Sequence, residues 1–148
     1  MGIAQYNAGN KQAAIDNFNQ VIRTNPNFSN AYRARGFIRS EGGDKQGALA
    51  DYNEAIRLNT NDAIAYHNRG YIRSGQADKQ GTIADYNEAI RINSKDADAY
   101  YFRALVYSQQ EDKRRAIDDF KKAANLYQQQ GNSEGYKQSQ DRIRELQQ

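Results

Sequence analysis

The sequence contains no cysteine and no tryptophan, and it has only one proline and one histidine among 148 residues. Without cysteine, the chain has no disulfide framework, no thiolate metal site and no thiol nucleophile. A single histidine, His67, does not provide a two-histidine metal site or a redundant histidine-based catalytic network. The scarcity of proline is typical of an all-helical chain. These absences argue against a disulfide-rich protein and against a metalloenzyme.

Long apolar runs are also missing. None approaches the length needed to span a bilayer, and the first five residues lack both the basic start and the apolar core of a signal peptide. The absence of cysteine is compatible with a reducing compartment. We therefore expect a protein without a membrane segment, located in the cytoplasm.

Neither sign of charge dominates the sequence. The 21 basic and 18 acidic residues give a net charge of +3 and are interspersed, and the only basic cluster, at 113–115, is soon followed by two aspartates. This mixture is typical of solvated helix faces rather than of a nucleic-acid surface. Only the pI of about 9.1 favours the alternative of an accessory RNA-binding role, and we do not expect a nucleic-acid partner.

Motifs for catalysis are absent as well. The sequence has no HExxH zinc motif, no GxSxG nucleophile elbow, no phosphate-binding loop and no dinucleotide fingerprint. The adjacent carboxylates Asp118 and Asp119 lie on a predicted helix and therefore point in different directions. We expect no enzymatic activity, no cofactor and no metal.

The dominant feature that is present is a 34-residue repeat. Residues 29–62 match residues 63–96 at 21 of 34 positions, including the whole run 50–57 against 84–91. A fixed period of this length indicates stacked supersecondary units. Such stacking also explains how a chain with only 38% hydrophobic residues can fold, because each unit buries its apolar stripe against its neighbours.

Each period predicts two helices. Apolar residues recur at helical spacing over Ser29–Glu41 and again over Lys45–Leu58. The Gly-Gly-Asp run at 42–44 separates them, with glycine supplying a positive φ and aspartate a cap for the next helix. The short turn makes the two helices antiparallel. Gly36 and Gly70 fall within first helices, where glycine costs about 1 kcal/mol relative to alanine, so we expect a close backbone approach there.

This pattern resembles the tetratricopeptide repeat (TPR) family, as in bacterial-type TPR domains. The family places an aromatic, a small residue, an alanine, a second aromatic and a second alanine at fixed spacing. One repeat of this chain supplies all five: Tyr32, Gly36, Ala48, Tyr52 and Ala55. The following repeats supply most of them, although the family's proline is present only as Pro26 of the first repeat.

The resemblance implies an all-α fold, a right-handed α-solenoid of antiparallel helix pairs (a TPR-like superhelix) with a C-terminal capping helix. We expect a single domain over residues 1–148, with a truncated first repeat at 1–28, three full repeats at 29–62, 63–96 and 97–130, and the capping helix at 131–148. The segment Ser133–Gln147 fits a cap because it is polar apart from a thin apolar stripe. A partner-docking helix is the alternative for this segment.

The first repeat lacks its opening aromatic residue. Counting back one period places the repeat's small residue at Gly2, so the aromatic falls before the sequence starts. Two explanations remain open: excision from a longer repeat array, which we favour, or a natural chain that begins with half a helix. Either explanation leaves apolar surface at the N-terminal edge that requires a neighbour.

Three arginines recur at the same period, and each has an aspartate on the following helix. The pairs are Arg35 and Asp51, Arg69 and Asp85, and Arg103 and Asp119. Repetition in every unit favours intramolecular ion pairs. The alternative is a basic ladder that binds an acidic partner through bidentate carboxylate contacts.

In the family that this chain resembles, the first helices line a concave groove that binds extended or helical peptides. Carried over by position, the residues that we favour for peptide binding are Asn30, Arg33, Phe37, His67, Asn68, Tyr71, Tyr101, Phe102 and Leu105. Ser40 and Glu41 extend the same face. These positions vary between repeats while the framework recurs, which is typical of a selective surface, although solvent-exposed variation is the alternative.

The composition of this groove indicates its ligand. One TPR subclass clamps a terminal carboxylate, but here Asp98 and Phe102 stand where basic residues are needed, so we reject that clamp. Aromatic residues with a polar rim suit a peptide with apolar anchors and an acidic flank. The sequence thus predicts a non-catalytic protein–protein interaction scaffold. The alternative is a self-assembling module that stacks or exchanges helices through its incomplete first repeat.

Overall fold

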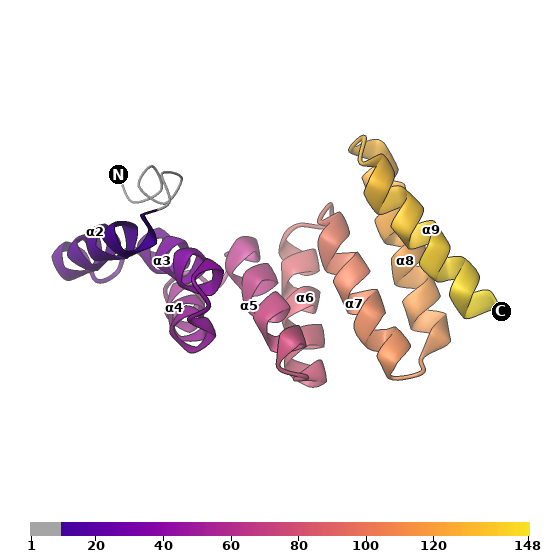
Figure 1. The fold of residues 1–148 in the computed structure, drawn as a ribbon, viewed down its shortest axis with the longest axis horizontal. Coiled ribbons are helices and arrows are strands. Elements are labelled where there is room, and N and C mark those ends of the chain that lie inside the picture. Colours follow the sequence, from indigo (N-terminus) through magenta and orange to yellow (C-terminus); the bar gives the residue numbers. More distant parts are fainter. Residues whose placement is uncertain (1–9) are drawn as a thin grey trace. The chain divides into compact units, whose positions relative to one another are not determined.

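The computed structural model describes residues 10–148, which form eight α-helices and no strand (Figure 1). The predicted start of the first repeat, including Gly2, lies outside the described residues. The helices are α2 (Lys11–Thr24), α3 (Ser29–Glu41), α4 (Lys45–Leu58), α5 (Ala63–Gly75), α6 (Lys79–Ile92), α7 (Ala97–Gln109), α8 (Lys113–Gln129) and α9 (Ser133–Gln147). The helices predicted over Ser29–Glu41, Lys45–Leu58 and Ser133–Gln147 are confirmed at both ends. Over the described range, no helix is both long and apolar enough to cross a membrane.

Aspartates start the second helix of each full repeat. Asp44, Asp78 and Asp112 each accept a hydrogen bond from the backbone N–H three residues later, at 2.9–3.0 Å. The residue before each cap has a positive φ, as predicted for the glycine-containing turn: 88° at Gly43, but 59° at Ala77 and 61° at Glu111. The turn therefore keeps one left-handed residue in each of the three full repeats, even where that residue is not glycine, and the cap holds that geometry.

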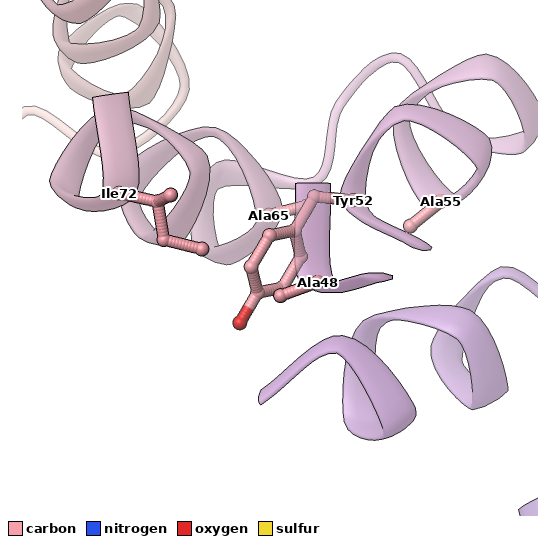
Figure 2. Packing of buried hydrophobic residues seen from close by; sticks show 5 residues of the cluster. All are labelled: Ala48, Tyr52, Ala55, Ala65 and Ile72. Atoms are coloured by element: carbon pink, nitrogen blue, oxygen red, sulfur yellow. The ribbon is translucent and has the colours of Figure 1, made fainter. Parts of the chain in front are cut away.

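The chain divides into two compact units, unit 1 (Met1–Ile72) and unit 2 (Arg73–Gln148). In unit 1, α3 packs against both α2 and α4. Tyr52 is 1% exposed and lies in a cluster with small residues of α4 and α5, and Figure 2 shows Ile72 directed toward its ring. A Cβ atom on Gly36 would stand 3.1 Å from both Asp51 Cβ and Tyr52 Cε1. The close helix approach predicted at Gly36 is thus confirmed.

In unit 2, α7 packs against α6 and α8, and α9 packs against α8. Phe120 is fully buried in a cluster with residues of α7, α8 and α9. From α9, Ile143 is buried and Leu146 packs at the edge of the same cluster. Tyr136 packs against a second cluster that contains Tyr127. The thin apolar stripe predicted for the last helix is therefore its packed face.

The recurring arginines lie inside the repeats. Arg35 Nε and Nη2 donate to the two carboxylate oxygens of Asp51 at 3.0 and 2.6 Å, and Arg39 Nη1 donates to Asp51 Oδ2 at 2.9 Å. Arg35 Nη1 also donates to Asn19 Oδ1 of α2 at 2.7 Å. Its guanidinium carbon lies 5.6 Å from the ring centroid of Tyr32. Arg35 thereby connects α2 and α4, the second helices of two successive repeats.

The same arrangement recurs farther along the chain. Arg103 donates to both carboxylate oxygens of Asp119 at 2.7 and 2.8 Å and to Asn87 Oδ1 at 2.7 Å. Burial opposes protonation there, but the hydrogen bonds and charge of Asp119 raise the pKa of Arg103 above its ordinary value. Arg69 donates to Asn53 Oδ1 at 2.8 Å. The predicted intramolecular ion pairs are confirmed for Arg35 and Arg103. The hydrogen bonds to the asparagines were not predicted.

Candidate functional site

Unit 1 contains a surface hollow of about 220 Å³ where α3, α4 and α5 meet. Its lining residues are Phe37, Ser40 and Glu41 of α3, Tyr52 of α4, and Asn68 and Tyr71 of α5. Residues three or four apart share one face of a helix, which brings the α3 residues together and likewise the α5 residues. Phe37 and Tyr71 stand one 34-residue period apart, so successive repeats present them at the same place.

Two of the lining residues are aromatic and exposed. The exposed fraction is 44% for Phe37 and 54% for Tyr71, against 1% for Tyr52. Exposed aromatics beside a concave surface are typical of interaction sites, since they offer apolar area at a low cost in side-chain entropy. Of the predicted binding residues, the structure brings Phe37, Asn68 and Tyr71 together here.

The hollow also has a polar side. A hydrogen bond joins the Tyr52 hydroxyl and the side chain of Asn68. Burial raises the pKa of Tyr52 above its ordinary value; the Asn68 hydrogen bond opposes this shift, whereas the negative charges of Asp51 and Glu41 add to it. Tyr52 therefore remains a neutral phenol throughout the physiological range and offers a hydroxyl group rather than a charge.

The other predicted residues of unit 1 lie outside the hollow. Arg33 Nη1 donates to Asp62 Oδ1 at 3.1 Å, and Arg33 Nη2 donates to Asn30 Oδ1 at 3.2 Å. Asp62 also accepts from the backbone N–H of Ala65 at 3.0 Å, so this network caps the start of α5. His67 is partly buried and does not line the hollow. Arg33 and Asn30 thus help to position α5.

The predicted residues of unit 2 pack against other side chains of that unit. The ring centroid of Tyr101 lies 5.3 Å from that of Phe120, and Leu105 joins the same cluster. Phe102 stacks on Tyr86 with a centroid distance of 6.1 Å and an interplanar angle of 16°. Leu105 is thereby more buried than its exposed counterparts in unit 1, Phe37 and Tyr71.

Tyr52 is the lining residue that sequence reasoning assigned only to the framework. The equivalent residues in the next two repeats are Tyr86 and Phe120, so the hydroxyl group is not required for packing at this position. This difference could have indicated that the Tyr52 hydroxyl has another role. Over residues 10–148, no group of three or more histidine, aspartate or glutamate side chains is arranged to hold a metal ion.

Family models match most of the sequence. A model described as "TPR repeat" matches residues 38–76, and two models described as "Tetratricopeptide repeat" match residues 63–96 and 97–130 in one case and residues 1–27 in the other. The chain belongs to the tetratricopeptide repeat family. The predicted α-solenoid fold class is confirmed, and the TPR fold is typical of protein–protein interaction modules.

Solved TPR structures share this fold. A crystal structure of MamA is 22% identical and covers 99% of this chain and 94% of its own, with a TM-score of 0.79. A tetratricopeptide repeat protein from Parabacteroides merdae is 21% identical and covers 96% and 62%, with a TM-score of 0.77. The Arabidopsis OM64 TPR domain is 26% identical and covers 79% and 94%, with a TM-score of 0.71. Curated protein sequences give no match.

Proposed function

We propose that this TPR chain is a non-catalytic protein–protein interaction scaffold, and that it binds a partner peptide or helix on the face formed by α3 and α5. The hollow flanked by the exposed rings of Phe37 and Tyr71 is the observation that carries this proposal. We centre the site on unit 1 because Tyr101, Phe102 and Leu105 pack within unit 2. The cysteine-free sequence supports a cytoplasmic location for such a scaffold.

A peptide selection tests this function. Random peptides displayed on phage are selected against the intact chain, and the affinity of enriched peptides is then measured by fluorescence anisotropy. Replacing both Phe37 and Tyr71 with alanine is expected to weaken binding by about tenfold or more, because aromatic anchors carry much of the energy of such interfaces. Circular dichroism should show unchanged helicity, since about half of each residue is exposed and neither belongs to the buried core.

Ile64→Ala is the matched control for this experiment. Ile64 is also a first-helix residue of unit 1 and is 55% exposed, but it does not line the hollow. The affinity of the selected peptides should stay unchanged in this variant. Equal binding by the intact chain and by the double alanine variant would show that the proposed surface is wrong.

Self-association is the second candidate function, and a second hollow supports it. This hollow, of about 510 Å³, is lined by Asn17, Gln20, Val21, Thr24, Asn25 and Phe28. Val21 is 37% exposed and Phe28 is 43% exposed. The residues one, two and three periods after Val21 are Ala55, Ala89 and Ala123, and all three are fully buried. A helix from a second copy of the chain would give Val21 the same cover.

Sedimentation velocity at several concentrations tests self-association. Val21→Lys is expected to shift the chain toward monomer, because a charged side chain would then have to be buried in the contact. Gln12→Lys, which adds the same charge to an exposed position of α2 outside the hollow, should leave the distribution unchanged. A strictly monomeric parent chain at all concentrations would exclude this second function.

A further inference from the structure

The second hollow, which lies along α2 and is called the edge hollow from here on, has lost the charges of its repeat positions. None of the six described residues that line it is charged. One, two and three periods after Asn17 stand Asp51, Asp85 and Asp119, and after Gln20 stand Glu54, Glu88 and Lys122. The centres of protein interfaces are depleted of charged residues in the same way, because burying an unpaired charge is unfavourable. The edge hollow thus has the composition of a contact surface.

Phe28 of the edge hollow stands in place of a helix cap. Its counterparts Asp62 and Asp96 accept hydrogen bonds from the backbone N–H groups three residues later, at 3.0 and 2.9 Å. Phe28 is the N-cap residue of α3, and no side-chain hydrogen bond caps that helix. A phenylalanine here forgoes the stabilisation that an aspartate supplies, and its ring is 43% exposed. Local helix stability therefore does not account for Phe28, whereas a partner on the edge hollow does.

A surface without charge suits a second copy of the same chain. In a two-fold dimer one patch meets the identical patch, so a residue near the axis lies beside its own copy. A charged residue in that place would repel itself. The uncharged side chains of Asn17, Gln20 and Val21 do not have this conflict. The edge hollow can therefore pack against itself.

The charges beside the edge hollow are complementary to themselves. Asp16 and Arg23 are both exposed, and seven residues separate them, so they lie on one side of α2, about 10 Å apart along its axis. The α2 residues of the hollow, within 17–24, are centred within about one residue of the midpoint of this pair. When two copies of α2 pack antiparallel about a two-fold axis at this place, the same sides face each other. Asp16 of each copy then comes beside Arg23 of the other.

The last helix, α9, does not offer a comparable surface. Its apolar residues Ile143 and Leu146 pack within unit 2. Its exposed residues are polar or charged, among them Lys137, Arg144 and Glu145. A head-to-tail stack would bury such charges against the uncharged edge hollow. Pairing of α2 with α2 avoids this cost and closes the contact at two copies.

We propose that the edge hollow binds the edge hollow of a second copy, which gives a closed two-fold dimer with antiparallel α2 helices and reciprocal Asp16–Arg23 ion pairs. This inference rests on the second candidate function, self-association, and names its partner surface and its stoichiometry. Val21 and Phe28 form the apolar centre of the contact. The ion pairs at its edge determine the direction in which the two helices run.

Charge reversal tests the antiparallel pairing, with the affinity of the full chain for itself measured by sedimentation velocity. Asp16→Arg and Arg23→Asp are each expected to weaken the dimer by about tenfold or more, because each brings like charges together twice. An equimolar mixture of the two variants should recover the parent affinity to within about threefold, since opposite charges then meet at both places. Asp118→Arg reverses an exposed acid of α8 and is the matched control, which should leave the affinity unchanged.

Phe28→Asp separates the contact from the stability of the fold. The aspartate supplies the cap that the equivalent helices have, so the urea midpoint of the monomeric chain should be unchanged or higher. The same substitution places a charge in the contact and is expected to weaken the dimer by about tenfold or more. A purely structural role of Phe28 would instead lower the urea midpoint.

The outcomes distinguish this inference from the function beneath it. A parent chain that associates but does not respond to either charge reversal would overturn the antiparallel pairing and leave self-association in place. So would a mixture of the two variants that dimerises no better than each alone. Assemblies that grow beyond two copies with concentration would overturn the closed dimer. A parent chain that is monomeric at every concentration would overturn both this inference and the second candidate function.

Discussion

Replacing Asp51 with alanine is expected to destabilise the fold by about 3 kcal/mol, the lower end of the range for breaking a buried ion pair. The Asp51 carboxylate is 3% exposed and accepts hydrogen bonds from both Arg35 and Arg39. Without it, Arg35 remains partly buried beside Tyr32 and Asn19 with no anionic partner, and Arg39 keeps only the weaker contact of its Nε with Asp44 Oδ2 at 3.9 Å. Their partial exposure, 15% and 24%, lets water solvate them in part, which is why the lower end applies.

Urea denaturation followed by circular dichroism measures this loss as a change in the free energy of unfolding. Asp51→Asn should cost less, because the amide retains the shape and one acceptor oxygen. Glu54→Ala is the matched control: Glu54 pairs with Arg57 on the exposed face of the same helix, so its removal should have little measurable effect. A loss below about 1 kcal/mol for Asp51→Ala would contradict the prediction, because it would show that the contacts of Asp51 with Arg35 and Arg39 contribute no more than ordinary surface ion pairs.

The sequence was sufficient to predict the fold because the framework repeats. Tyr52, Ala55 and Gly36 recur in register with their counterparts, and a residue that fits the same packed environment in each repeat leaves a periodic signal. The arginine–aspartate pairs followed from the same argument. Their asparagine partners were equally periodic, at positions 19, 53 and 87, and could have been found from that spacing.

The candidate site was less predictable, since it depends on the residues that vary. Asn68 and Phe102 occupy equivalent positions, yet one borders a hollow and the other stacks on a tyrosine ring. Tyr101 and Leu105 were expected on an exposed groove, but side chains of α8 and α9 pack against them. Which side chains fill the space between two helices depends on volumes and rotamers of several elements together, and a one-dimensional period does not encode that packing.

The largest packing effect is expected in unit 2, at Phe120. This ring is fully buried, lies 5.3 Å from Tyr101 between ring centroids, and contacts Ala104, Ala116 and Ile143 in one cluster. Phe120→Ala is expected to lower the free energy of unfolding by about 3–5 kcal/mol, because it removes apolar contacts and leaves a cavity that close-packed helices refill only in part. Urea denaturation measures the loss, and hydrogen exchange should accelerate at amides of α7, α8 and α9.

Phe120→Tyr is the control that keeps an aromatic ring, since tyrosine occupies the equivalent position at Tyr52 and Tyr86. The backbone at this point of the repeat therefore accepts the larger ring, and the cost should stay below about 1.5 kcal/mol. The comparison separates cavity formation from the identity of the aromatic residue. If the alanine and tyrosine variants lost similar amounts of stability, Phe120 would not be the centre of the unit 2 core. The packing of α7 against α8 would then not depend on the buried aromatic ring.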